Sequence, residues 1–384
     1  MASFLLAIIY ISFVSLGLPD ALLGAAWPTM QIDLAVPVSY AGGISLIIAI
    51  GTVVTSLEAD RLIKWLGTGK IMVISVALTA LALYGFSISS AYWHLCLWAV
   101  PYGLGAGCVD ASLNNYVALH YASRHMSWLH CMWGLGASIG PYIMGAALTG
   151  GLSWNRGYSI IALLQVVLTA VLLLSIPLWK KTSDGQQDGI RKEPLTMKQI
   201  LAIPGAKEVM LAFFCYCALE QTAILWGSSY LVAHDGMPEE VAASLASLYL
   251  IGLTAGRGLN GFLTYKMSDT NLIRLGQGII ALSIAIMLLP LGPTASFVGL
   301  MLNGLGGAPV YPCIIHSTPA HFGEENSQAL IGVQMASAYV GICVMPPVFG
   351  ILARYITASL LPWYLAAILV VMVVMCEKLN RICK

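Results

Sequence analysis

Four ionisable side chains fall in the middle of long apolar stretches: Asp20, Asp110, Glu220 and Arg257. A charged group inside a lipid bilayer costs roughly 3 kcal/mol, so such residues are candidates for function. Withdrawal from water favours the protonated form of a carboxyl, and a second carboxyl nearby favours it further. Asp20 and Asp110 therefore predict a proton-binding site, and Glu220 is a candidate for the same proton-coupling role.

Each of the four residues also has a plainer interpretation. Asp20 follows Pro19 and would serve as a helix cap, and Asp110 would hydrogen-bond a packed helix. Glu220 would be the counter-ion of a cation, and Arg257 lies one predicted helix away. Arg257 itself would reach toward the membrane surface, form a gating ion pair or contact a substrate. We favour function for the two aspartates and leave the other two residues open.

The composition is that of an integral membrane protein. Hydrophobic residues make up 59% of the 384 residues, 9% are charged and the mean hydropathy is +0.84, whereas a soluble domain averages about 25% charged residues. About 20 apolar residues in a helix cross a bilayer core. We therefore predict an all-α integral membrane protein with twelve transmembrane helices, near residues 4–28, 41–60, 70–90, 94–120, 127–149, 156–179, 208–233, 240–265, 271–292, 295–317, 326–350 and 357–378.

Basic residues are distributed unevenly between the predicted loops. One side has only Arg156 and Arg354, and the other has Arg61, Lys64, Lys70, Arg124, Lys180, Lys181, Arg191, Lys192, Lys198, Lys207, Lys266, Arg274, Lys378, Arg381 and Lys384. Basic loops stay in the cytoplasm, which predicts a bacterial-type inner (plasma) membrane protein with both termini cytoplasmic. The polar stretch 180–207 predicts a cytoplasmic linker, with a short surface helix, between two six-helix bundles at 1–179 and 208–384.

A four-residue element of the form small-x-x-polar recurs in four of the predicted helices. It reads Gly17-Leu-Pro-Asp20, Gly107-Cys-Val-Asp110, Ala218-Leu-Glu-Gln221 and Ala308-Pro-Val-Tyr311. The copies are 90 residues apart within each half and 201 apart between halves, as a duplicated three-helix unit would leave. Such repeats are typical of transporters whose site lies near the bilayer midplane and whose halves alternate its access.

The stretch between the second and third predicted helices carries a recognisable motif. It reads Ser56-Leu-Glu-Ala-Asp60-Arg61-Leu-Ile-Lys-Trp-Leu-Gly67-Thr-Gly-Lys70, with a degenerate copy at Gly256-Arg257 and Tyr265-Lys266. It resembles the loop motif of the major facilitator superfamily, G-x-x-x-D-R-x-G-[RK]-[RK], with Ser56 in place of the first glycine. The resemblance covers essentially the whole chain and implies the major facilitator fold, two pseudo-symmetric six-helix bundles with a cavity at their interface.

Four charged residues are candidates for gating. Glu58, Asp60 and Arg61 lie in the loop motif at the end of the second predicted helix, where we expect a conformational latch between the halves. Arg257 lies in the degenerate copy of the motif and is the fourth gating candidate.

Within the superfamily, the chain resembles the fucose permease branch of proton-coupled sugar symporters. The helix 4 motif of that branch, roughly G-L-G-x-x-E-x-x-x-N-P, is matched from Gly103 to Asn115, with Asp110 for the glutamate and Asn115 for the proline. Asp20 matches the acid of its first helix, and 134–141 resembles its glycine-rich packing face. The resemblance implies a proton-coupling role for both aspartates.

A sugar site combines aromatic faces with amide and carboxyl groups that bind hydroxyls. Six predicted helices offer this mixture, and the candidate substrate contacts are Trp27, Asn114, Asn115, Tyr116, His130, Trp133, Tyr216, Gln221, Tyr311, Asn303 and Gln334. Trp27 is also typical of an interfacial anchor. His130 would either titrate with the carboxyls or hydrogen-bond a neighbouring helix, and His316 is expected to be structural.

These patterns predict a secondary active transporter and no enzyme, because no phosphate loop, zinc spacing or nucleophile elbow is visible. We expect proton-coupled symport of a sugar or similar neutral hydroxylated solute by alternating access. The alternatives are a proton-driven exporter of drugs or other small molecules and a non-transporting membrane sensor. The expected partners are the solute and the lipid bilayer, without nucleic acid, and the chain is expected to act as a monomer. No cofactor or metal is expected; the coupling ion is a proton, with sodium as the alternative.

Overall fold

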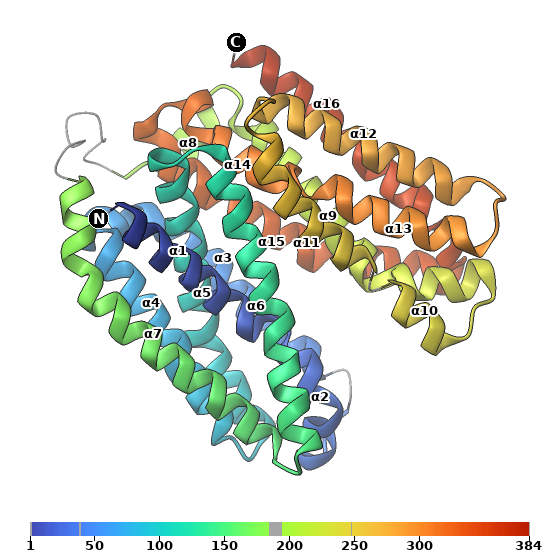
Figure 1. Cartoon of the computed structure of the whole chain (residues 1–384), viewed down its shortest axis with the longest axis horizontal. Helices are drawn as coiled ribbons and strands as arrows, with labels where there is room; N and C mark the ends of the chain where they lie inside the picture. Colours follow the sequence, from blue (N-terminus) through green and yellow to red (C-terminus); the bar gives the residue numbers. More distant parts are fainter. Residues whose placement is uncertain (1, 38–39, 184–193, 247, 384) are drawn as a thin grey trace. The chain divides into compact units, whose positions relative to one another are not determined.

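The computed structural model describes residues 2–37, 40–183, 194–246 and 248–383, and over these ranges the chain is almost entirely helical and contains no strand (Figure 1). The α-helices, in chain order, are α1 Ala2–Asp20, α2 Leu22–Asp33, α3 Tyr40–Leu66, α4 Thr68–Ser87, α5 Tyr92–His120, α6 Ser123–Thr149, α7 Trp154–Ser183, α8 Met197–Ala202, α9 Ala206–Asp235, α10 Glu239–Ala246, α11 Leu248–Leu263, α12 Asp269–Leu288, α13 Pro293–Gly307, α14 Val310–Phe322, α15 Glu324–Tyr355 and α16 Leu361–Ile382. A 3-10 helix, η1 Ala358–Leu360, precedes α16.

Helices lie at all twelve predicted positions. Among the described residues, ten spans are long and apolar enough to cross a membrane. The other two positions are occupied by α5, whose polar residues include Asp110, and by α10 with α11. The prediction of an all-α membrane protein is confirmed.

Two helices that were predicted as single elements are divided in the structure. Over 4–28, α1 ends at Asp20 directly after Pro19, and α2 begins at Leu22. Over 295–317, α13 ends at Gly307, and α14 follows Pro309. Proline has no backbone N–H, and its ring displaces the carbonyl four residues before it. Both predicted spans are confirmed as candidate membrane crossings, over Phe4–Asp33 and Pro293–Phe322, and each is interrupted once. The first interruption directly follows the repeated element that ends at Asp20, and the second lies within the element 308–311.

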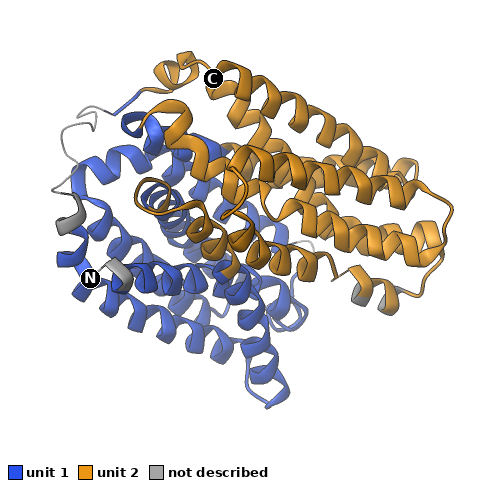
Figure 2. Cartoon of the chain, turned by 45° about the horizontal axis from the view of Figure 1, so that its top comes forward, with its two compact units in different colours: residues 1–116, 132–195, 324–336 blue, residues 117–131, 196–323, 337–384 orange. Residues whose placement is uncertain are grey.

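The chain forms two compact units, coloured separately in Figure 2. Unit 1 comprises 1–116, 132–195 and 324–336, and unit 2 comprises 117–131, 196–323 and 337–384. Each unit thus takes one segment, 324–336 or 117–131, from the opposite half of the sequence. The predicted linker falls partly on 184–193, outside the described residues. Its predicted short helix is α8, which begins with a capping box formed by Thr196 and Gln199.

The sequence repeat is visible in the packing of both units. In unit 1, a Cβ added at Gly103 of α5 would lie 2.2 Å from the Ile48 carbonyl oxygen of α3. In unit 2, one added at Gly304 of α13 would lie 2.1 Å from the Tyr249 carbonyl oxygen of α11. Both members of the second pair follow those of the first by 201 residues. Glycine is required here because the helix backbones touch, and the same contact is built twice.

Candidate functional site

Asp20 lies at the broken end of α1 in unit 1, and its carboxyl has two neutral hydrogen-bond donors. The Tyr102 hydroxyl of α5 donates to Oδ1 at 3.2 Å, and the Trp133 indole Nε1 of α6 donates to Oδ2 at 2.7 Å. The residue that caps α2 is Ala21, which has no side-chain capping bond. The helix-cap interpretation of Asp20 therefore does not hold. Asp20 is classed as exposed by its accessible surface, unlike Asp110.

The glycine-rich stretch of α6 places Trp133 beside Asp20. Cβ atoms added at Gly136 and Gly140 would lie 2.0 Å and 1.9 Å from carbonyl oxygens of α1, and one added at Gly17 of α1 would lie 2.1 Å from the Trp133 carbonyl oxygen. The two backbones are in contact along this face, as the predicted packing role of 134–141 requires. Asp20 lies one turn from Gly17 on the same side of α1, within reach of the indole.

Asp110 lies in the middle of α5, with only 6% of its surface exposed. Its Oδ1 accepts a hydrogen bond of 2.7 Å from the Asn114 side chain, one turn further along α5. Asp20 is near enough for its charge to act on Asp110. None of the ion pairs among the described residues includes either aspartate. The pair can therefore lower its mutual repulsion by binding a proton.

Unit 2 holds a second buried acid, but this one has a cation beside it. Glu220 Oε2 of α9 lies 3.5 Å from Arg257 Nη2 of α11, and the two side chains are 15% and 4% exposed. The Tyr216 hydroxyl, one turn before Glu220, donates to the same oxygen. Of the alternatives for Glu220, the structure shows the counter-ion of Arg257. Whether either residue serves coupling or gating stays a prediction.

Aromatic rings gather beside this ion pair within unit 2. The Tyr311 ring of α14 lies 4.4 Å from the His130 ring, 4.6 Å from the Phe213 ring and 6.0 Å from the Tyr216 ring, measured between centroids. His130 belongs to the first turns of α6 and is buried. Gln221, half-buried, follows Glu220 directly. Four of the predicted substrate or coupling residues of unit 2 are thus brought together around Arg257, namely Glu220, Tyr216, Tyr311 and His130.

Several predicted substrate residues have other neighbours. Trp27 lies in a buried apolar cluster with Leu22 and Met30, and Tyr116 packs edge-on against the Trp179 ring at 5.0 Å. Three more are polar. Asn115 Oδ1 accepts a 2.6 Å hydrogen bond from Ser327, and Asn303 donates a 2.9 Å hydrogen bond to Ser283. Gln334 is fully buried. These contacts connect neighbouring helices, and a substrate role for the five residues stays a prediction.

Tyr102 is a site residue that the sequence predictions missed. It lies eight positions before Asp110 on the same helix, so two turns of α5 place both side chains on one face. That spacing was the available signal, since Tyr102 lies about three turns inside α5, deeper than the end of a membrane helix where tyrosines are usually interfacial anchors.

The predicted gating residues of the loop motif form two ion pairs within α3. Arg61 Nη1 lies 3.1 Å from Glu58 Oε2, and both side chains are about half exposed. Lys64 Nζ lies 2.8 Å from Asp60 Oδ2, and Asp60 is buried. The latch role of Glu58, Asp60 and Arg61 stays a prediction.

Comparison with known proteins places this geometry in a family. A sequence profile of the Major Facilitator Superfamily matches residues 9–301 and 209–379. Bypass of stop codon protein 6 of Saccharomyces cerevisiae is 23% identical over 285 residues, 67% of this chain and 56% of that protein. The glucose/mannose transporter GlcP of Bacillus subtilis is 21% identical over 264 residues, 67% of this chain and 65% of GlcP. The chain thus spans less than two thirds of the length of these two relatives.

A human relative is covered more fully, and solved structures share the fold. Sodium-dependent glucose transporter 1 of Homo sapiens is 24% identical over 388 residues, 89% of this chain and 72% of that protein. The crystal structure of FucP, a transporter of the superfamily in the outward conformation, matches with a TM-score of 0.75 at 17% identity, over 96% of this chain and 98% of FucP. Another FucP structure is that of the E. coli fucose:proton symporter. At this identity the structural likeness shows the fold.

Proposed function

Because the chain belongs to the major facilitator superfamily, whose members are membrane transporters and not enzymes, we propose that it is a secondary active symporter. It carries a sugar or a similar neutral hydroxylated solute together with a proton. The observation that carries this proposal is the acid pair of unit 1. Asp20 is exposed, Asp110 is buried, and both are held by neutral donors.

The acid pair supports proton coupling through its electrostatics. Two ionised carboxylates that act on each other, with no cation paired to them, favour the uptake of one proton. The indole and the phenol hold Asp20 in place without neutralising it. A proton arriving at Asp20 therefore removes the repulsion with Asp110, and the energy of the site then depends on whether the proton is bound. That dependence is what a proton-driven carrier requires.

The neutrality of the solute is supported by the charges of the two units. The cation placed deep in unit 2, Arg257, is already paired with Glu220. The groups around that pair are phenols and an imidazole, which bind hydroxyl groups. The named relatives agree with this class of solute, since their names include a glucose/mannose transporter, a sodium-dependent glucose transporter and a fucose:proton symporter.

In the proposed cycle, Asp20 takes a proton from outside, the solute binds, and the carrier alternates inward. Release of the proton and the solute on the other side resets it. The distribution of basic residues supports an inner (plasma) membrane location with both termini in the cytoplasm. The carrier acts as a monomer, and no resident cofactor takes part.

The test is sugar-driven proton movement in proteoliposomes. Wild type, Asp20→Asn and Asp110→Asn are challenged with a panel of neutral sugars while the external pH is recorded. We expect one sugar to alkalinise the outside with wild type and to give no pH change with either variant. Asp33→Asn is the matched control, because Asp33 of unit 1 also accepts a bond from an indole, that of Trp154 at 2.8 Å. It should retain the signal.

Other outcomes overturn parts of the proposal. Sugar uptake that depends on a sodium gradient and not on a proton gradient would show that sodium, not the proton, is the coupling ion. Proton movement in the opposite sense, driven by hydrophobic cations and by no sugar, would establish an exporter instead. Proton movement that persists in both aspartate variants would remove the acid pair from the mechanism.

A further inference from the structure

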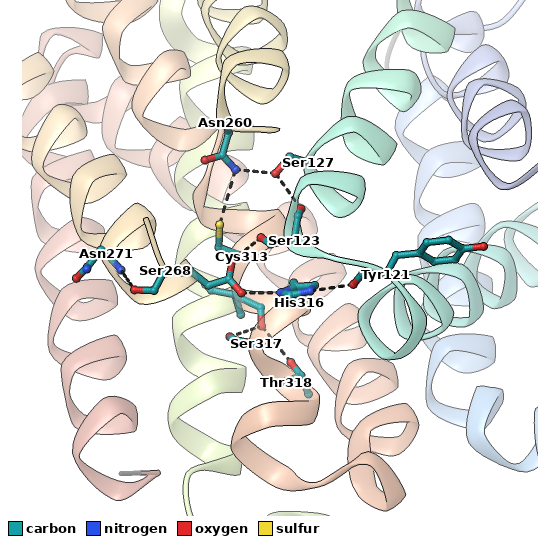
Figure 3. A network of polar contacts seen from close by, with 12 residues as sticks. Tyr121, Ser123, Ser127, Asn260, Ser268, Asn271, Cys313, His316, Ser317 and Thr318 are labelled. Carbon is teal, nitrogen blue, oxygen red and sulfur yellow. Dashed lines mark hydrogen bonds and ion pairs between the residues drawn. The ribbon is translucent and has the colours of Figure 1, made fainter. Parts of the chain in front are cut away.

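The segment 117–131, which joins α5 to α6, is built into unit 2 by contacts with α11. Ser127 Oγ accepts a 2.7 Å hydrogen bond from Asn260 (Figure 3). Cys131 Sγ lies 3.9 Å from the Thr254 carbonyl oxygen. A Cβ added at Gly261 would lie 2.1 Å from the Trp128 indole nitrogen. The first turns of α6 are therefore closely fitted to α11.

His316 of α14 connects the same segment to α12. Its Nδ1 lies 2.6 Å from Asp269 Oδ2, and its Nε2 lies 3.1 Å from the Tyr121 carbonyl oxygen. The other Asp269 oxygen accepts a hydrogen bond from Ser123, the first residue of α6. Figure 3 shows the imidazole of His316 beside Tyr121. One histidine and one carboxylate thus hold the α5–α6 turn against two helices of unit 2.

Both ring nitrogens of His316 face hydrogen-bond acceptors, which only the doubly protonated ring satisfies. A neutral imidazole carries one N–H and one lone pair, so its lone pair would face either a carboxylate or a carbonyl oxygen. Asp269 is the first residue of α12, after the N-cap Ser268, where the helix dipole stabilises a carboxylate. Histidine changes its charge between about pH 5 and 8, and the charged ring makes the stronger bonds. Both hydrogen bonds of His316 can therefore form at low pH, and one of them is lost at high pH.

The other titratable groups at this place lie on α14 or carry their charge elsewhere. Cys313 and His321, on the same helix as His316, also face Asp269. From the α6 side the pair meets the Ser123 hydroxyl and the Tyr121 carbonyl, both neutral. Arg124, next to Ser123, lies over the Tyr265 ring at 5.2 Å. On α6, His125 packs edge-on against the Tyr121 ring, with 5.6 Å between the centroids. His316 is the histidine that joins Asp269 to the Tyr121 carbonyl oxygen.

We propose that His316 and Asp269 form a proton-dependent latch that keeps the start of α6 docked on unit 2. The inference rests on the proposed function for its consequence, because α6 also carries Trp133, the donor to Asp20. This end of unit 2 bears Arg124, Lys266 and Arg274 and is the predicted cytoplasmic end. Acidification of the cytoplasm tightens the latch and slows alternation. A symporter that imports protons would thereby limit its own acid load.

The native thiol of Cys131 reports the docking directly, since the half-buried side chain packs on α11. The purified full chain in lipid nanodiscs, without any sugar, is treated with N-ethylmaleimide at about pH 6 and about pH 8. Alkylation of the Cys131 peptide is then followed by mass spectrometry. The thiolate fraction itself rises with pH, so each rate is divided by that of His316→Gln at the same pH. We expect the wild type to react about fivefold more slowly than His316→Gln at the lower pH, and equally at the higher pH.

Two further variants keep the proposal falsifiable. Asp269→Asn should also remove the pH dependence, because an amide can donate to the lone pair of a neutral His316. Asp20→Asn with Asp110→Asn should keep it, and this result would separate the latch from the acid pair. The latch is overturned if the alkylation rate of Cys131 in wild type, divided by that in His316→Gln, is the same at both pH values. It is also overturned by a pH dependence that vanishes only in the double aspartate variant. Because no sugar is present, failure of the transport assay leaves this result standing.

Discussion

The two units treat their intramembrane acids differently. In unit 1, Asp20 and Asp110 are bonded by neutral donors, and no ion pair among the described residues includes them. In unit 2, Glu220 lies 3.5 Å from the guanidinium of Arg257. A carboxyl without a cation can give up its charge by binding a proton, whereas a paired carboxylate keeps its charge. One repeated scaffold thus holds two acids without a cation in unit 1 and an acid paired with a cation in unit 2.

The repeat shows where this difference arises. Gln221 and Tyr311 stand 201 residues after Asp20 and Asp110, so unit 2 carries no acid at the equivalent positions. Its acid, Glu220, is one residue earlier on the helix and faces α11, where Arg257 lies. A shift of one residue turns a helical side chain by about 100°. The acid that pairs with Arg257 therefore lies on a different face of its helix from the position equivalent to Asp20.

The largest expected effect comes from making the same acid-to-amide change in both units. Glu220→Gln leaves Arg257 buried without a counter-ion, and we expect the free energy of unfolding to fall by about 3 kcal/mol. Asp110 is in none of the ion pairs among the described residues, so Asp110→Asn leaves no cation without its partner. The free energy of unfolding should therefore change by less than about 1 kcal/mol. Unfolding of the purified proteins in a denaturing detergent series measures both.

A double variant separates charge from packing in unit 2. Glu220→Gln combined with Arg257→Gln removes both charges, and it should recover most of the stability that Glu220→Gln loses. If Asp110→Asn proved as costly as Glu220→Gln, the distinction between the two acid sites would fail.

A smaller effect is expected from the contact that positions the acid pair. In Gly17→Ala the new methyl group would lie 2.1 Å from the Trp133 carbonyl oxygen. The resulting overpacking should cost about 1–3 kcal/mol and weaken sugar-driven proton movement by moving the indole away from Asp20. Gly24→Ala, on the next helix with nothing within 4 Å, should instead stabilise by about 0.5–1 kcal/mol. Equal stabilities for the two variants would show that the contact between α1 and α6 does not hold the site.

Much of the fold was predictable because lipid solvation leaves a strong sequence signal. Twenty-residue apolar stretches can only be helices, since backbone groups find no water in a bilayer. The acids of unit 1 were found for the same reason: Asp20 and Asp110 interrupt such stretches. The break at Pro309 was harder to predict, because membrane helices also tolerate proline when neighbouring groups take up the freed bonds.

The contacts between helices were less predictable, because they depend on the rotation of each helix about its axis. Asn115 is predicted to contact the sugar, and only the structure shows that its Oδ1 also accepts a hydrogen bond from Ser327 of α15. His316 was expected to be structural, and only the structure shows that both of its nitrogens face acceptors. No local pattern indicates that residues so distant as 121, 269 and 316 meet.

The smallest expected effect on stability comes from an arginine of the loop motif, which is the exposed counterpart of Arg257. Arg61 and its partner Glu58 are 58% and 47% exposed and lie three residues apart on α3, so water screens their attraction. Arg61→Gln should therefore change the free energy of unfolding by no more than about 0.5 kcal/mol. If the motif serves as a latch, the rate of sugar uptake should still fall several-fold. A loss of stability as large as that of Glu220→Gln would mean that exposure does not separate the two ion pairs, and an unchanged uptake rate would remove Arg61 from gating.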